Sequence, residues 1–232
     1  ELSTLMNAYY EVLFKPVRDY GGIVSDVVGD AMLAIWVSQK HNPLYKDQVC
    51  QAAIEISKGV ESFNRMRSAS PLPTRIGVHC GPMVLGNVGA LNHFEYRAIG
   101  DMVNTTTRIQ GMNKYLGTRR LASTEIAAST RDYFYRDVGE FILAGRSQPI
   151  HLWELIKPMD ELSEHDKTKK EQFENCLAVF YAADWARAQL LFQAFLLDYP
   201  NDGPTLFYIN QCESYLQQQA DEWTGAVAMQ SK

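Results

Sequence analysis

The chain has 232 residues, of which 46% are hydrophobic, so it is long enough to bury a sizeable core in one or two domains. Its formal net charge of −5 gives no reason to expect a nucleic-acid partner. No apolar run reaches about 18 residues, no signal peptide is seen, and the four cysteines lie in no paired spacing, so we expect a cytoplasmic location.

Two short apolar segments flank Gly29-Asp30 near the start of the chain. Residues 23–28 alternate apolar side chains, and residues 31–36 resume the apolar pattern at once, which predicts two strands joined by a tight turn. Asp30 is expected at that turn. A carboxylate held at the end of a rigid hairpin is a common ligand for Mg²⁺ or Mn²⁺, although the same spacing also suits a plain turn.

A helix and then a strand followed by a second helix are predicted further along. Residues 46–67 place their apolar side chains on one helical face, which predicts ordinary core packing. The strand-like segment Phe94 to Ile99 leads into Gly100-Asp101 and a helix on which Asn104 and Arg108 share one face. An amide beside a guanidinium can hold a sugar oxygen and stabilise charge on a phosphorus, whereas a solvated helix face has the same spacing.

The C-terminal third changes in composition. Charged residues crowd residues 157–172, which we interpret as a linker, and residues 173–232 then show three amphipathic helical patterns. The segment AADWARAQLLFQAFLLDYP resembles a tetratricopeptide repeat through Trp185, Ala188, Phe192 and Pro200. A single repeat cannot bury its own faces, so we expect this extension to pack on the preceding domain or on a partner.

Three segments together carry a family resemblance: GGIVSDVVGDAMLAIW, RIGVHCGPMVLGNVG and EYRAIGDMVNTTTRIQ. In order and spacing they resemble the class III adenylyl and guanylyl cyclases over residues 1–156. The resemblance implies an α/β domain of ferredoxin-like cyclase fold, an α+β sandwich with a mostly antiparallel central sheet flanked by helices, here followed by a small all-α extension. It also implies a homodimer, because two such domains pair head to tail with ATP or GTP between them.

The resemblance assigns roles position by position. Asp30 matches a metal-binding aspartate, Asn104 the asparagine that orients the ribose, and Arg108 the arginine that stabilises the transition state. Arg146 falls where the family often has a lysine for the terminal phosphates, and Asp101 is included among the nucleotide-binding residues. The implied cofactors are Mg²⁺ or Mn²⁺, two per site.

Two departures from the family pattern affect these expectations. The family's first metal aspartate lies on a strand that would precede Glu1, so we expect a fragment without that strand, which leaves the two-metal chemistry incomplete. The base-selecting positions hold Asp26 and Arg97, which are expected either to pair with each other across the dimer or to contact the base. Either purine fits these donors and acceptors, and the resemblance favours ATP.

The function expected from the resemblance is conversion of ATP to 3′,5′-cyclic AMP and pyrophosphate, in the output domain of a signalling protein. An upstream sensor domain is expected in the full-length protein. If the full-length protein has a membrane anchor, this domain is expected to lie in the cytoplasm. Two alternatives stay open: a guanylyl cyclase, and a catalytically inactive cyclase-like module that dimerises or regulates.

Overall fold

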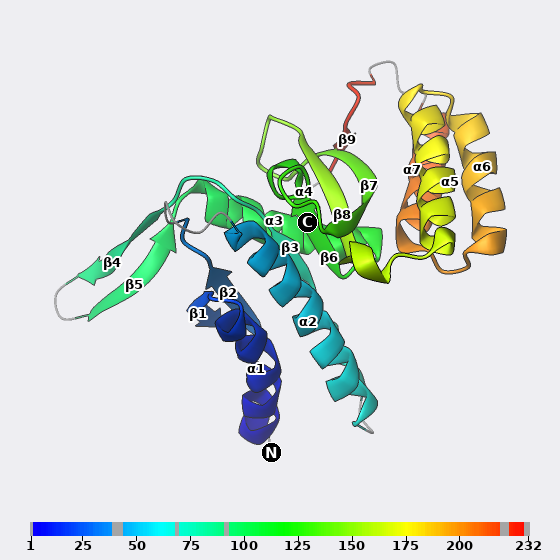
Figure 1. Cartoon of the computed structure of the whole chain (residues 1–232). Coiled ribbons are helices and arrows are strands. Elements are labelled where there is room, and N and C mark those ends of the chain that lie inside the picture. The colour runs from blue at the N-terminus through cyan, green and yellow to red at the C-terminus, as the bar shows by residue number, and fades with distance from the viewer. Residues whose placement is uncertain (1, 39–43, 68–69, 91–92, 219–222, 230–232) are drawn as a thin grey trace.

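The computed structural model describes residues 2–38, 44–67, 70–90, 93–218 and 223–229 (Figure 1). The elements in chain order are α1 (Leu2–Asp19), β1 (Ile23–Val28), β2 (Ala31–Ile35), α2 (Tyr45–Arg65), β3 (Ile76–Val78), β4 (Val84–Ala90), β5 (His93–Ile99), α3 (Asp101–Leu116), β6 (Arg120–Ser123), α4 (Thr124–Ala127), β7 (Tyr133–Ile142), β8 (Ile150–Pro158), a 3₁₀ turn (Met159–Glu161), α5 (Glu164–Tyr181), α6 (Trp185–Asp198), α7 (Gly203–Gln218) and β9 (Val227–Ala228). The predicted hairpin at residues 23–36 and the predicted helices after residues 45 and 100 are confirmed.

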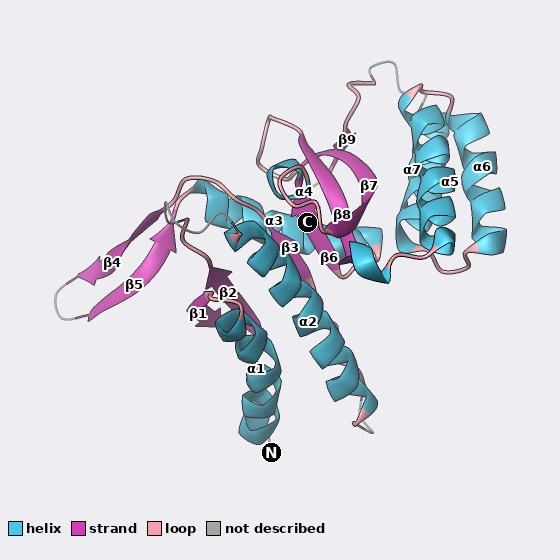
Figure 2. Cartoon of the chain, viewed as in Figure 1, coloured by secondary structure: helices cyan, strands magenta, loops and turns pink. Residues whose placement is uncertain are grey.

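The strands form one larger sheet and two hairpins among the described residues (Figure 2). The larger sheet has the order β3-β6-β8-β7-β9, with parallel pairing at its two outer steps and antiparallel pairing between. The hairpins β1–β2 and β4–β5 are antiparallel ladders of their own. The α/β architecture with a central sheet and flanking helices is therefore confirmed, and most of its strand pairs are antiparallel.

Helices cover both faces of the larger sheet. On one face α2 and α4 bury Cys50, Ile54 and Ile126 against the strands, and on the other α3 buries Ile109 and Leu116. Two apolar layers around a short-stranded sheet are what the alternating strand pattern requires, because each strand face must be removed from water. The larger sheet therefore holds α3 in place, and α3 carries three of the predicted site residues, Asp101, Asn104 and Arg108.

The N-terminal part packs around α1. Tyr9, Leu13 and Val17 of α1 are buried with Ile56 and Val60 of α2, and side chains of β1 and β2 pack against this cluster. This helical layer supports the β1–β2 hairpin from below, as Figure 1 shows at the N-terminal end. The turn of the hairpin is thereby fixed to α1.

The expected linker at residues 157–172 is wrong. Strand β8 continues to Pro158, and α5 begins at Glu164 after a capping box in which Ser163 and Asp166 bond each other's backbone N–H groups. Most of the charged residues belong to this helix, and Asp166 of its capping box lies 2.8 Å from Lys157 at the end of β8. Crowded charges indicated solvation, but here they form the solvated face of a helix.

The C-terminal helices share a core with the larger sheet and α3. Phe173, Phe180 and Phe192 are completely buried in the same cluster as Phe141 of β7 and Leu116 of α3. The expectation that the extension packs on the preceding domain is confirmed. Its likeness to a tetratricopeptide repeat stays a prediction.

A buried ionic network fastens this extension to the sheet. Arg136 of β7 donates to Glu154 of β8 at 2.6 and 3.0 Å and to Asp202, just before α7, at 2.8 Å. Lys169 of α5 lies 2.8 Å from the same Asp202 carboxylate. Burial alone would raise the pKa of Asp202, but the positive charges of Arg136 and Lys169 outweigh that effect and lower it.

Two glycines bring α3 and α7 into backbone contact. A Cβ on Gly203 would lie 2.7 Å from the Cα of Gly117, and a Cβ on Gly117 would lie 2.9 Å from the Cα of Gly203. Gly117 also has a positive φ of 63° where α3 ends. No side chain fits between the two helices at this point.

Across the described ranges, no helix is both long and apolar enough to span a bilayer.

Candidate active site

The turn between β1 and β2 presents Asp30 to solvent. Gly29 has a positive φ of 61°, which a tight hairpin turn needs, and its carbonyl accepts a hydrogen bond from the Tyr10 hydroxyl. The backbone of the turn is thereby held to α1 while the Asp30 side chain stays exposed. Asp30 lies at the turn, as the sequence predicts.

Asp30 alone supplies only part of a binding site for a divalent cation. Nowhere in the described ranges do three His, Cys, Asp or Glu side chains gather closely enough to hold a metal ion. Mg²⁺ in nucleotide sites is often held by one or two carboxylates together with substrate phosphates. A single carboxylate therefore suits one ligand position for such a cation, and a two-metal site needs a further carboxylate.

The position of α3 is set by direct contact with the backbone of β3. A Cβ on Gly77 would lie 2.7 Å from the carbonyl oxygen of Thr106, so only glycine allows this approach. The side-chain amide of Asn113, which is fully buried, donates to the Ile76 carbonyl at 3.0 Å. These contacts fix the rotation of α3 and hence the direction of its polar face.

Three of the predicted site residues come together at the N-terminal half of α3. Arg146, in the loop after β7, places its Nη1 2.9 Å from Oδ2 of Asp101 and also donates to Thr105 Oγ1. The guanidinium of Arg108 lies beside Gly145, because a Cβ there would be 3.3 Å from Nη2. We refer to Asp101, Thr105, Arg108 and Arg146 as the α3 cluster. It joins residues 45 positions apart in the sequence and holds two cations beside one loop.

Asn104 lies on the same stretch of α3 and is exposed, whereas Arg108 is half-buried. Their spacing of four residues puts both on one face, as predicted. Thr105, Thr106 and Thr107 turn their hydroxyls back to the carbonyls of the preceding turn, at 2.8, 2.8 and 3.1 Å. That leaves a lone pair of Thr105 Oγ1 to accept from Arg146.

The structure pairs Asp26 with Arg97 within one chain, whereas one expectation from the sequence is a pairing across the dimer. Arg97 Nε lies 3.6 Å from Asp26 Oδ2 within one chain, because β5 runs beside β1. The physical reason is the neighbourhood of the two hairpins, which brings these side chains together without a second protomer. The pair is partly exposed and offers an acceptor next to a donor.

Two polar groups at this end of the molecule were not among the predicted site residues. His79, just after β3, has its Nδ1 2.8 Å from the Ser123 hydroxyl and 3.7 Å from a Glu125 carboxylate oxygen. Burial lowers the pKa of His79 below 6.5, so the ring is neutral near pH 7. The other missed group is Thr105, whose only signal in the sequence is its place four residues after Asp101.

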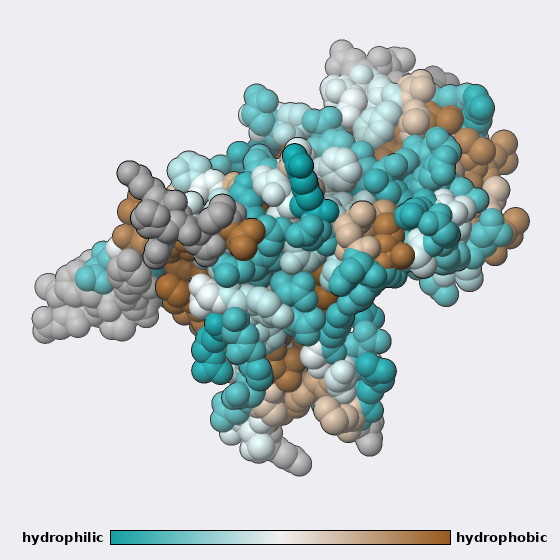
Figure 3. Space-filling model, viewed as in Figure 1, coloured by the Kyte–Doolittle hydropathy of each residue, from teal (hydrophilic) through white to brown (hydrophobic). Residues whose placement is uncertain are grey.

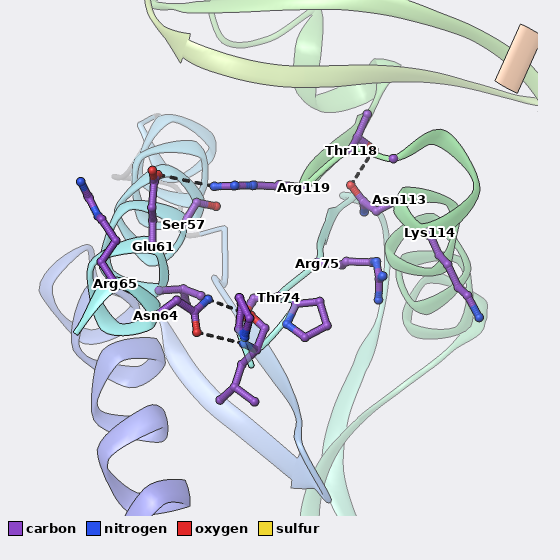
Figure 4. A pocket seen from close by; sticks show the side chains of 15 residues that line it. Ser57, Glu61, Asn64, Arg65, Thr74, Arg75, Asn113, Lys114, Thr118 and Arg119 are labelled. Carbon is purple, nitrogen blue, oxygen red and sulfur yellow. Dashed lines mark hydrogen bonds and ion pairs between the residues drawn. The ribbon is translucent and has the colours of Figure 1, made fainter. Parts of the chain in front are cut away.

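The described surface also contains a cavity of about 470 Å³ that is separate from these groups (Figure 4). It is lined by the C-terminal half of α2, residues 71–75 and the end of α3, with Arg75, Lys114 and Arg119 around it. None of the predicted site residues lines it. We therefore place the candidate site at the hairpins and α3 and not in this cavity.

Apolar side chains are exposed on both hairpins. Ile23, Val27 and Val28 of β1 and Val84 and Ile99 of β4–β5 are each 40% or more exposed. Figure 3 shows brown, apolar surface next to the base of β4–β5. No hydrogen bond or ion pair among the described residues joins Asp30 to the α3 cluster within one chain.

Comparison with known proteins identifies relatives of this arrangement. Residues 1–157 match the family described as the adenylate and guanylate cyclase catalytic domain. Adenylate cyclase 1 of Rhizobium meliloti (strain 1021) is 32% identical over 160 residues, which cover 67% of this chain and 24% of that protein. The adenylate cyclase of Dictyostelium discoideum described as terminal-differentiation specific is 27% identical over 214 residues, covering 89% of this chain and 10% of that protein. The chain thus spans a quarter or less of these curated relatives.

A solved structure shares the fold. The adenylyl cyclase CyaB from P. aeruginosa aligns with a TM-score of 0.61 at 22% sequence identity, covering 70% of this chain and 85% of that one. At this identity the likeness concerns the fold alone.

Proposed function

The chain belongs to the family of adenylate and guanylate cyclase catalytic domains, and on that premise we propose that it converts ATP to 3′,5′-cyclic AMP and pyrophosphate. The ribose 3′ oxygen attacks the α-phosphorus and forms the new P–O bond. The bond from the α-phosphorus to the bridging oxygen breaks, pyrophosphate leaves, and the 3′ hydroxyl proton passes to solvent or to a phosphate oxygen. The relatives named adenylate cyclase support ATP as the substrate.

The observation that carries this proposal is the α3 cluster. Arg108 and Arg146 bring two guanidinium groups to one loop, with Asn104 one turn before Arg108. Phosphoryl transfer depends mainly on positioning and on neutralising charge at the phosphoryl oxygens. We assign Arg108 to the charge on the α-phosphoryl group, Asn104 to the ribose and Arg146 to the terminal phosphates.

Asp30 is proposed as a carboxylate ligand for Mg²⁺ or Mn²⁺. The metal, when bound with the nucleotide, supplies charge neutralisation at the phosphates. Asp30 itself contributes a fixed negative charge at a turn that α1 holds rigid through Tyr10. Two metals per site need another carboxylate, and among the described residues no group of three or more His, Cys, Asp or Glu side chains gathers into a metal site.

A homodimer is part of the proposal. Asp30 lies on the β1–β2 hairpin and the α3 cluster lies on α3 and the loop after β7, and the head-to-tail pairing that the family resemblance implies would bring Asp30 of one copy to the α3 cluster of the other. The exposed apolar residues of the two hairpins give this pairing a surface to bury. An upstream sensor domain in the full-length protein remains a proposal from the family resemblance alone.

Guanylyl cyclase activity is the second candidate, because the Asp26–Arg97 pair can bind guanine as well as adenine. The Asp26 carboxylate accepts from guanine N1 and N2, and Arg97 donates to O6. The same pair also accepts from the adenine amino group and donates to adenine N1. An activity assay therefore has to determine which purine base the site accepts.

The test is formation of cyclic nucleotide from ATP and from GTP, assayed separately with Mn²⁺ in the natural full-length protein. We expect cyclic AMP and pyrophosphate from ATP, and Arg108→Ala should lose on the order of 10²-fold or more in turnover. Lys114→Ala is the matched control, since it removes an exposed cation from the other end of the same helix. Asp30→Asn should abolish the metal-dependent activity. A folded dimer that makes neither product would instead support the inactive module.

A further inference from the structure

The Arg146 guanidinium is engaged by groups of its own chain. Its Nη1 contacts Asp101 Oδ2 at 2.9 Å and Thr105 Oγ1, and its side chain is 28% exposed. Asp101 is the first residue of α3, and its side chain is 70% exposed. The ion pair therefore consists of a restrained cation and a carboxylate that faces solvent.

A carboxylate and a phosphate compete for the same guanidinium. Both are planar or tetrahedral oxyanions that accept charge-assisted hydrogen bonds from arginine. The pair is exposed on the Asp101 side, so breaking it leaves a carboxylate that water solvates at little cost. Thr105 keeps Arg146 beside α3 when the pair opens, because its contact does not involve Asp101's side chain.

The negative charge of Asp101 also offsets part of the positive charge at this loop. The Arg108 guanidinium lies beside Gly145, the residue before Arg146, so the loop and α3 bring two cations to the same part of the molecule. Two unopposed guanidinium groups would hold a polyphosphate tightly before and after reaction. Asp101 is the carboxylate in direct contact with one of them.

We propose that Asp101 is an internal competitor for the polyphosphate at Arg146: it lowers the affinity of the site for the triphosphate and for the pyrophosphate product, and so favours product release. This inference rests on the function proposed above, because it takes Arg146 as the residue for the terminal phosphates. The opposite role, in which Asp101 holds Arg146 ready for phosphate, predicts changes of the opposite sign.

The decisive measurement is calorimetric titration of inorganic pyrophosphate into the protein at low ionic strength, in EDTA so that no metal contributes. Asp101→Asn keeps the size and hydrogen-bonding shape of the side chain and removes its charge. We expect its Kd for pyrophosphate to fall roughly three- to tenfold, with the gain shrinking as salt is added. An unchanged or higher Kd would overturn the proposal.

Two further variants separate the contact from a general charge effect. Glu61→Gln removes one exposed carboxylate from α2, where it lies 3.5 Å from Arg119, and should leave the Kd unchanged. In an Arg146→Gln background, Asp101→Asn should no longer tighten binding. Equal tightening in both backgrounds would mean long-range repulsion and would refute the competition at Arg146.

Turnover gives an independent reading. In Asp101→Asn the KM for ATP should fall and inhibition by added pyrophosphate should strengthen by a similar factor. Tighter pyrophosphate binding in a protein that makes no cyclic nucleotide would refute the proposed reaction and leave the competition standing. Normal cyclic nucleotide formation with weaker pyrophosphate binding in the variant would refute the competition alone.

Discussion

Replacing Arg136 by methionine tests the energetic role of the buried network between the sheet and the C-terminal helices. The side chains of Arg136, Glu154 and Asp202 are 4%, 19% and 3% exposed. Methionine approximately conserves the volume next to the Phe173 ring, over which the guanidinium lies at 4.7 Å, so little cavity is created. The main effect is electrostatic, since Glu154 loses both of its hydrogen bonds to arginine.

Breaking one partner of a buried ion pair costs about 3–5 kcal/mol because the remaining charge is left uncompensated. Asp202 keeps Lys169 at 2.8 Å and still accepts from the Thr205 hydroxyl at 2.8 Å, so the lower end of that range applies. A loss of about 3 kcal/mol lowers the melting temperature of a chain of this size by roughly 6–12 °C.

The assay is thermal and urea unfolding followed by far-ultraviolet circular dichroism. Arg119→Met is the matched control, because Arg119 and Glu61 form an exposed pair at 3.5 Å and should contribute less than about 0.5 kcal/mol. Adding Glu154→Gln to Arg136→Met should restore part of the stability by removing the orphaned charge. An Arg136→Met protein as stable as the Arg119→Met control would refute the reasoning.

Two further predictions concern the loop at Gly145 and the pH dependence of one histidine. Gly145→Ala forces a side chain into a positive φ of 71° and within 3.3 Å of Arg108, so we expect about tenfold lower turnover because that arginine is displaced. Gly225→Ala, which also forces a side chain into a positive φ, of 83°, but in open space, should leave turnover unchanged in the same assay. The hydrogen bond that His151 Nε2 donates to Asp137 Oδ1 raises the pKa of His151 above 6.5. The stability that this pair adds is therefore fully present below pH 6.5 and is lost as the pH rises through the raised pKa. NMR titration should show that pKa falling in Asp137→Asn, and a His151 pKa at or below 6.5 in the wild type would contradict the assignment.

Local patterns in the sequence predicted those parts of the fold that depend on neighbouring residues. The hairpin around Gly29-Asp30 follows from alternation and a glycine at the turn, and α2 and α3 follow from helical spacing. The same reasoning put Asn104 and Arg108 on one helix face. It could not give their surroundings, because the neighbouring groups come from distant segments.

The errors and omissions have a common physical origin in tertiary pairing. Arg136 lies in a strand where alternation alone suggests a solvated charge, yet its partner Asp202 is 66 residues away. Asp26 and Arg97 meet only because two separate hairpins run side by side. The wrong linker prediction has a different cause. The Ser163–Asp166 capping box is a local sequence signal for the start of a helix, but the high density of charged residues was interpreted as a linker instead.

The backbone contact between Gly117 and Gly203 limits how this catalytic part and its helical extension can be recombined. A graft of C-terminal helices from another protein would bring its own residue to position 203, and any side chain there would meet the Gly117 backbone. The incoming helix would have to shift outward, and the shared aromatic core around Phe173 and Phe180 would open with it. A functional chimera therefore needs glycine on both sides of the junction before its interface residues are matched.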